Sequence, residues 1–169
     1  YKRQATRILD APFVIDQGPG LGKWKPANYT KKFYGPSAMR IGIEKSRNLM
    51  TVRLARTIGM KAVAKYAYKF DIMANMPEQL SMSLGAGETT LMKLTAAYAM
   101  LVNGGKQIRP TFIDRIQDRN GKTIFRQEER ICSACNAKFQ SRSLVPQVPD
   151  LRAQVVSSTS AYQMVRMLE

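Results

Sequence analysis

The sequence predicts an α+β fold that is mostly helical and carries one β-hairpin. Apolar residues recur at helical spacing in several segments of residues 37–105. Asn120-Gly121, the strongest short hairpin-turn signal, separates two segments of alternating apolar and polar residues. The chain has 169 residues, of which 44% are hydrophobic and 23% charged, and this is enough for one domain with a buried core.

Residues 1–36 are expected to form a short strand and loops. The apolar segment 8–15 is interrupted by Pro12, which favours an edge strand or a loop. Residues 18–36 are rich in glycine, proline, lysine and aromatic residues, a composition typical of a loop.

Residues 37–105 are expected to form a helical subdomain. Ser37 is a candidate N-cap of its first helix, Thr89 or Thr90 of its last, and Gly59 suits a left-handed position between two helices. Residues 80–84 are expected to be extended. Helices are predicted at about 37–45, 48–58, 61–70 and 91–102. The residues expected to face inward are Leu49, Val52, Leu54 and Ala55 in the second helix and Leu91, Leu94, Ala97, Tyr98 and Leu101 in the last.

The C-terminal part is predicted to contain the hairpin and one more helix. Residues 106–127 hold the hairpin, with strands near 111–117 and 123–125. Residues 128–154 are polar and are expected to form a long loop. A last helix is expected within 155–169, capped by one of the serines at 157–160.

The net charge of +15 is unevenly spread along the chain. Residues 1–70 hold 15 Lys/Arg and 3 Asp/Glu, or +12, whereas residues 71–169 hold 12 and 9, or +3. A basic field attracts polyanions, so nucleic acid, an anionic membrane surface, an acidic polymer and a solvated face without a partner all stay open. No helix-turn-helix, zinc or RNP-type signature accompanies the charge.

The sequence contains no histidine, which excludes Ser-His-Asp and Cys-His catalysis within this chain. A serine nucleophile would need a lysine as its base. No apolar run approaches the roughly 20 residues that span a bilayer, and the N-terminus is not a signal peptide. A membrane anchor is therefore expected outside this chain.

Cys132-Ser133-Ala134-Cys135 leaves three interpretations open. Zinc commonly needs four ligands, and no second cysteine pair or histidine is present. A redox pair is expected beside a βαβ unit, whereas this pair lies in a polar stretch. The favoured interpretation is a structural disulfide or a pair of thiols without a function. A metal shared with another chain and a redox pair are less favoured.

Two short motifs have ordinary structural interpretations. Gly85-Ala86-Gly87-Glu88 precedes a predicted helix but lacks the further glycines or Gly-Lys-Ser/Thr of nucleotide-binding loops, so it is interpreted as a tight turn. Ser46-Arg47-Asn48 lies between the first two predicted helices. Taken alone, it is a helix end followed by an asparagine N-cap.

The surroundings of Ser46-Arg47-Asn48 resemble a known family. Gly35-Pro36-Ser37-Ala38-Met39-Arg40 and Ile43-Glu44-Lys45-Ser46-Arg47-Asn48-Leu49 are similar to the S-x-N region of class A (bifunctional) penicillin-binding proteins. The resemblance extends over nearly the whole chain and implies the penicillin-binding transpeptidase or serine β-lactamase-like fold. Further blocks in matching order are Leu9-Asp10-Ala11-Pro12, Leu84-Gly85-Ala86-Gly87-Glu88-Thr89-Thr90 and Asn103-Gly104-Gly105.

The resemblance implies acyl transfer by a serine nucleophile in an S-x-x-K motif, beside a K-T/S-G strand. In the family, the S-x-N serine bridges the two lysines and relays a proton to the leaving amine. The asparagine amide suits a peptide bond because it both donates and accepts. Ser46 and Asn48 are thereby candidate catalytic residues, and Asn48 also a candidate substrate-binding residue. Arg47, at the variable position, receives no role, and neither a cofactor nor a metal is implied.

Two motifs of the family are absent from this sequence. Ser-x-x-Lys does not occur, and Lys122-Thr123 is followed by Ile124 instead of glycine. The nucleophile, the K-T/S-G strand and a glycosyltransferase domain are therefore expected outside this chain, and the chain alone is expected to be inactive.

The expected function is that of a central fragment of a peptidoglycan D,D-transpeptidase. Such an enzyme crosslinks stem peptides and is acylated by β-lactams. The expected partners are stem peptides, β-lactam antibiotics, the rest of the transpeptidase domain and, through an anchor elsewhere, the membrane; nucleic acid is not expected. The expected location is the bacterial inner membrane, with a single-pass anchor and the domain in the periplasm. A basic nucleic-acid-binding module and an inactive structural domain stay open as alternatives.

Overall fold

The structure, a computed structural model, describes residues 3–16, 20, 22–127, 130, 132, 135 and 148–169. Strands and helices are mixed along the chain, and the predicted α+β class is confirmed. The described strands form three antiparallel pairs, β1–β4, β2–β3 and β5–β6. The elements are β1 (Arg7–Asp10), β2 (Ile15–Asp16), β3 (Lys23–Trp24), β4 (Gly35–Ala38), α1 (Met39–Glu44), α2 (Asn48–Ile58), α3 (Met60–Lys69), the 3-10 helix η1 (Leu80–Leu84), α4 (Leu91–Val102), β5 (Arg115–Gln117), β6 (Thr123–Arg126) and α5 (Ser158–Leu168).

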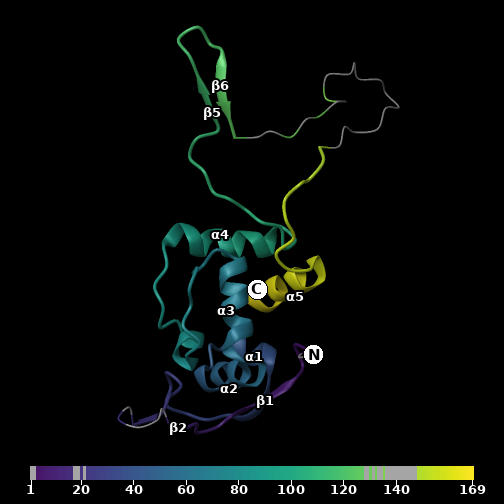
Figure 1. Ribbon diagram of the computed structural model, residues 1–169. Helices are drawn as coiled ribbons and strands as arrows, with labels where there is room; N and C mark the ends of the chain where they lie inside the picture. Colours follow the sequence, from purple (N-terminus) through teal and green to yellow (C-terminus); the bar gives the residue numbers. More distant parts are fainter. Residues whose placement is uncertain are drawn as a thin grey trace, which may run out of the picture.

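The helices connect two ends of the molecule. Strands β1 and β2 lie beside α1 and α2 at one end, and α3 runs from there toward α4 (Figure 1). Helix α5 packs against both α1 and α4, and η1 packs against α2. The hairpin β5–β6 projects beyond α4, away from the other elements (Figure 1).

Strand β4 corrects two predictions. The segment 18–36, expected to be loop, contains β3 and the start of β4, which pairs with β1 so that Asp10 lies opposite Gly35. Ser37 lies within β4 and does not cap α1, whose N-cap is Ala38 without a side-chain hydrogen bond. The pairing joins residues 25 to 31 positions apart in the chain, and a local pattern cannot show it. Strand β4 also spans the boundary expected at residue 36.

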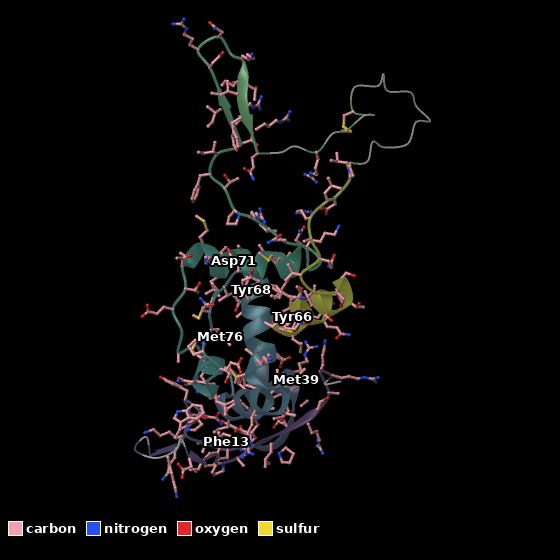
Figure 2. The ribbon with its side chains drawn as sticks, in the orientation of Figure 1. Phe13, Met39, Tyr66, Tyr68, Asp71 and Met76 are labelled. Carbon is pink, nitrogen blue, oxygen red and sulfur yellow. A yellow bond between two sulfur atoms is a disulfide. The ribbon has the colours of Figure 1, made fainter. Side chains whose placement is uncertain are left out.

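The first apolar core lies under α2. Leu49, Val52 and Ala55 are buried as predicted, whereas Leu54 is only partly buried. Phe13 packs with Leu49 and Val52, and Figure 2 shows it at the strand end of the molecule. The segment 80–84 forms the 3-10 helix η1, so the predicted extended conformation is wrong. Its two leucines, Leu80 and Leu84, are partly buried and pack against this core.

The second apolar core lies between α4 and the segment before α5. Thr90 caps α4 as predicted, its hydroxyl accepting from the Lys93 N–H at 3.2 Å. Ala97 is buried as predicted, together with Ala96, Met100 and Val155. The inward prediction is wrong for three residues that remain exposed on α4, which are Leu91, Leu94 and Tyr98.

The hairpin and the last helix form as predicted, with shorter strands. Gly121 has φ 81°, and the Asp118 carboxylate accepts from the N–H groups of Asn120 and Lys122 at 2.8 and 2.9 Å. Strand β5 begins at Arg115, because the residues before it have no partner strand. Ser157 caps α5 by accepting from the Ser160 N–H at 3.3 Å. Most of the expected loop 128–154 lies outside the described residues. No helix in the described part of the chain has the length and apolar character to cross a membrane.

Candidate functional site

Ser46 lies in the exposed turn that joins α1 to α2. Its φ of 48° is in the left-handed region, where a residue other than glycine costs about 1–3 kcal/mol. The N–H groups of Ser46 and Arg47 donate to the carbonyls of Ile43 and Gly42 at 3.0 and 2.8 Å, which closes the turn. Arg47 is the N-cap of α2 and Asn48 its first helical residue, so the capping role predicted for Asn48 is wrong.

The two candidate catalytic side chains differ in how firmly they are held. The Asn48 Nδ2 donates to the Ala27 carbonyl at 2.9 Å, which fixes the orientation of the amide. Within the part of the chain that the structure describes, the Asn48 Oδ1 and the Ser46 hydroxyl make no hydrogen bond. Both of these oxygen atoms are therefore available to a ligand or to another segment.

The side chain of Arg47 turns inward, beneath the turn. Only 13% of it is exposed, and its Nη1 donates to the Ser37 Oγ at 2.9 Å. The guanidinium carbon lies 4.0 Å from the centre of the Tyr34 ring, a cation–π contact. The same Nη1 is 3.8 Å from the Oδ2 of Asp10.

Asp10 and Asn28 form a buried polar pair below Arg47. Asp10 is fully buried, and its Oδ1 accepts from the Asn28 Nδ2 at 2.8 Å. That Nδ2 also donates to the Lys32 carbonyl at 2.9 Å, while the Oδ1 of Asn28 accepts from the Leu49 N–H at 3.2 Å. Asn28 therefore caps the first turn of α2 from a distant loop, since no residue of the turn before the helix does so.

A surface hollow of about 330 Å³ opens beside the turn. Its described lining carries two cations and no carboxylate, so it favours negatively charged or hydrogen-bond-accepting groups. Among the described residues, no group of three His, Cys, Asp or Glu side chains could hold a metal ion. The lining residues are Asn28, Tyr29, Thr30, Tyr34, Lys45, Ser46 and Arg47.

The cysteine pair lies far from this turn in the sequence. Cys132 and Cys135 are joined by a disulfide, and no described cysteine is free. The neighbouring residues of the pair lie largely outside the described part of the chain.

Sequence reasoning missed the residues that support the turn. Asp10 was noticed only as part of a resembling block, and Asn28 and Tyr34 were assigned to a loop. Their contacts with Arg47 and Leu49 span 13 to 37 positions of the chain. An aspartate that follows Ile8 and Leu9 in an apolar segment is the one sequence signal that points to them, because a carboxylate buried in such a segment needs partners.

Comparisons with known proteins identify the family of the chain. The family described as "Penicillin binding protein transpeptidase domain" matches residues 3–169. Penicillin-binding protein 1A of Rickettsia bellii is 42% identical over 161 residues, which cover 94% of this chain and 20% of that protein. Penicillin-binding protein 1A of Haemophilus influenzae is 33% identical over 131 residues, or 76% of this chain and 15% of that protein. The chain thus spans about a fifth of the length of the first of these relatives and less of the second.

Solved structures give the same answer for the fold. The crystal structure of penicillin-binding protein 1A from Haemophilus influenzae superposes with a TM-score of 0.79 and 26% identity, covering 99% of this chain and 26% of that one. Penicillin-binding protein A of Mycobacterium tuberculosis, solved as a penicillin G acyl-enzyme complex, superposes with a TM-score of 0.67 at 17% identity, covering 98% of this chain and 38% of that one. The alternative of a nucleic-acid-binding module gains no support. The family resemblance is confirmed, and the chain belongs to the penicillin-binding protein transpeptidase domain family.

Proposed function

We propose that this chain forms the S-x-N side of the active site in a longer serine D,D-transpeptidase that crosslinks peptidoglycan stem peptides. The observation that carries the proposal is the exposed turn at Ser46-Arg47-Asn48 in a chain of this family. In that turn the Ser46 hydroxyl has no hydrogen-bond partner within the described residues, while the backbone around it is tied on both sides.

Ser46 is proposed to move a proton during acyl transfer. A hydroxyl both donates and accepts, so it passes a proton from the nucleophile's lysine to the leaving amine without changing its own charge. Ser46 is exposed on the turn, where the family's two lysines would approach it. Both lysines belong to motifs that this sequence lacks.

Asn48 is proposed to hold a peptide bond of the acyl donor. One of its amide hydrogens is engaged by the Ala27 carbonyl, which leaves the Oδ1 and the other hydrogen to pair with a peptide N–H and C=O. An amide that is already oriented loses little further side-chain entropy when it binds substrate.

The rest of the transpeptidase domain is proposed to cover the apolar side of α4. Leu91, Tyr98 and Val102 are 81%, 54% and 75% exposed, and contiguous exposed apolar surface of this kind marks an interface. A hollow of about 350 Å³ between α4 and α5 is lined by Tyr98, Leu101, Val102, Val165, Leu168 and Glu169. Because this lining is mostly apolar, we expect an apolar segment of the same domain to cover it in the longer protein.

β-Lactams are proposed as covalent inhibitors, because a structural neighbour is described as an acyl-enzyme complex with penicillin G. The proposed location is the periplasmic face of the inner membrane, with an anchor and a glycosyltransferase domain elsewhere in the protein. The basic field of residues 1–70 suits anionic lipid and peptide carboxylates on that face.

The proposal is tested by the acylation rate of the full-length protein with a fluorescent penicillin. Ser46→Ala should slow acylation by about 10²–10⁴-fold, the usual range for a positioned acid–base group, without changing the thermal unfolding temperature. The 169-residue chain alone should form no covalent adduct, because it contains no Ser-x-x-Lys.

Thr57→Ala is the matched control for this test. Thr57 lies in the last turn of the same helix, and its exposed hydroxyl donates to the Arg53 carbonyl at 2.8 Å. This variant loses a hydroxyl away from the turn and should acylate as the parent does. An unchanged rate in a folded Ser46→Ala variant would remove Ser46 from the mechanism.

A further inference from the structure

The side chain of Arg47 is held by three different kinds of contact, although it sits at the middle position of the motif. It donates to the Ser37 hydroxyl at 2.9 Å, lies over the Tyr34 ring at 4.0 Å and faces the buried Asp10 carboxylate at 3.8 Å. The neighbouring side chains of Lys45 and Ser46 are exposed. The side chain of Arg47 therefore connects the exposed turn to buried residues of the strand end.

The carboxylate of Asp10 fixes where the guanidinium must lie. An isolated buried charge is disfavoured because it loses its hydration, so a cation close to a fully buried carboxylate stabilises it. Within the described residues, the Asp10 Oδ2 and the Arg47 Nε make no hydrogen bond, so charge attraction and the stacking on Tyr34 hold the pair together. These contacts leave the guanidinium little freedom to move.

Three consecutive residues at the start of α2, Arg47, Asn48 and Leu49, are each anchored to segments that precede α1 in the chain. Arg47 is tied through its side chain, Asn48 through its amide to the Ala27 carbonyl, and Leu49 through its N–H to Asn28, which itself donates to Asp10. The strained backbone of Ser46 directly precedes this anchored segment. A left-handed serine persists only where the surrounding structure determines it.

We propose that Arg47 is a positioning residue of the active site, which sets the orientation of Ser46 through its contacts with Asp10, Ser37 and Tyr34. This inference rests on the proposed function of Ser46. The middle position of the motif varies in the family. In this chain, the positioning role of Arg47 comes from its contacts with buried partners.

Arg53 provides a matched control on the same helix. It is also a partly buried arginine with a cation–π contact, 4.9 Å from the centre of the Phe13 ring, and it donates to the Pro12 carbonyl at 2.8 Å. Like Arg47, it has a buried Nε without a hydrogen bond among the described residues. Arg53 anchors α2 to the β1–β2 connection, and within the described residues it makes no hydrogen bond, ion pair or ring contact with the turn.

The test compares Arg47→Met, Arg47→Lys and Arg53→Met in the full-length protein, with a fluorescent penicillin as the probe. Arg47→Met should lower the first-order acylation constant by about 10–100-fold, because displacement of a reacting group by about 1 Å has effects of that size. Arg47→Lys keeps the charge opposite Asp10 and should recover part of the rate. Arg53→Met should lower the unfolding temperature about as much as Arg47→Met does, but it should leave the acylation constant within about 3-fold of the parent.

A double variant separates positioning from a general loss of stability. If Arg47 acts through Ser46, Arg47→Met should have little further effect in a Ser46→Ala background, since effects that share a residue are not additive. Equal fold-losses in both backgrounds, or parental acylation by a folded Arg47→Met variant, would overturn the inference. If Ser46→Ala slows acylation while Arg47→Met does not, the proposed function survives and the role of Arg47 fails.

Discussion

The two ends of this molecule are stabilised by different kinds of contact. At the strand end, the turn of the motif rests on a buried polar set, in which Asp10 accepts a hydrogen bond from Asn28 and pairs its charge with Arg47 at 3.8 Å. At the α4–α5 end, small and apolar side chains such as Ala96 and Met100 pack without such partners, and α4 leaves an apolar surface exposed. Directional contacts fix a geometry, whereas apolar packing tolerates adjustment. The end with the fixed geometry is the one that carries the motif.

The largest effect is expected from removal of the charge at the centre of the polar set. Asp10→Ala leaves Arg47 and the Asn28 amide without their buried partner, and should lower the free energy of unfolding by about 3–5 kcal/mol. The measurement is urea unfolding of the purified protein.

Glu88→Ala is the control for the loss of a carboxylate, because Glu88 is exposed in the loop before α4. It should change the free energy of unfolding by less than about 0.5 kcal/mol. A loss below about 1 kcal/mol for Asp10→Ala would mean that the polar set does not hold the strand end, and the contrast between the two ends would disappear.

A smaller effect is expected at the α4–α5 end from Gly105→Ala. Gly105 has φ 80°, and an added Cβ would lie 2.2 Å from the Val156 carbonyl oxygen, so the backbone before α5 must move. The Val155 and Val156 N–H groups, which donate to the Gly105 carbonyl at 2.8 and 3.2 Å, should then exchange their hydrogens faster. Amide hydrogen exchange at these two residues measures the change.

Gly104→Ala separates crowding from backbone strain. Its φ of 67° is also left-handed, but an added Cβ would meet nothing within 4 Å, so only the strain of about 1–2 kcal/mol applies. Gly105→Ala should destabilise by about 1–3 kcal/mol more than Gly104→Ala. Equal effects of the two variants would indicate that this end is loose enough to absorb a methyl group.

The two ends also differ in how much of them the sequence predicts. Thr90, Ser157 and Asn120-Gly121 act on residues within four positions of themselves; the sequence predicts the turn and names Thr90 and Ser157 among the candidate caps. The pairing of β1 with β4 and the contact of Asn28 with Leu49 join distant segments, so no local pattern contains them. Exposure of Leu91 was unpredictable for another reason: helical periodicity shows which side of a helix is apolar, but not whether a segment within this chain covers it.

The smallest effect is expected from the ion pairs that close the segment before α5. Arg152 and Lys106 donate to the exposed Asp150 carboxylate, each at 2.8 Å, and these hydrogen bonds hold the pKa of Asp150 well below its ordinary range. A lowered pKa in the folded state stabilises the protein fully above the ordinary aspartate value of about 4, and this contribution is lost as the pH falls through the folded-state pKa.

Asp150→Asn should therefore lower the unfolding temperature slightly at about pH 7, and the difference from the parent should narrow as the pH falls from about 5 to 2. Because the partners are exposed, about 0.5 M salt should shrink the difference at neutral pH as well. Scanning calorimetry across pH and salt measures both trends. A difference that does not narrow between about pH 5 and pH 2 would show that the amide disturbs the segment sterically instead of removing charge attraction. A difference that resists salt would mean that this end, like the strand end, contains a charge pair shielded from water, and the contrast between the two ends would then be one of degree.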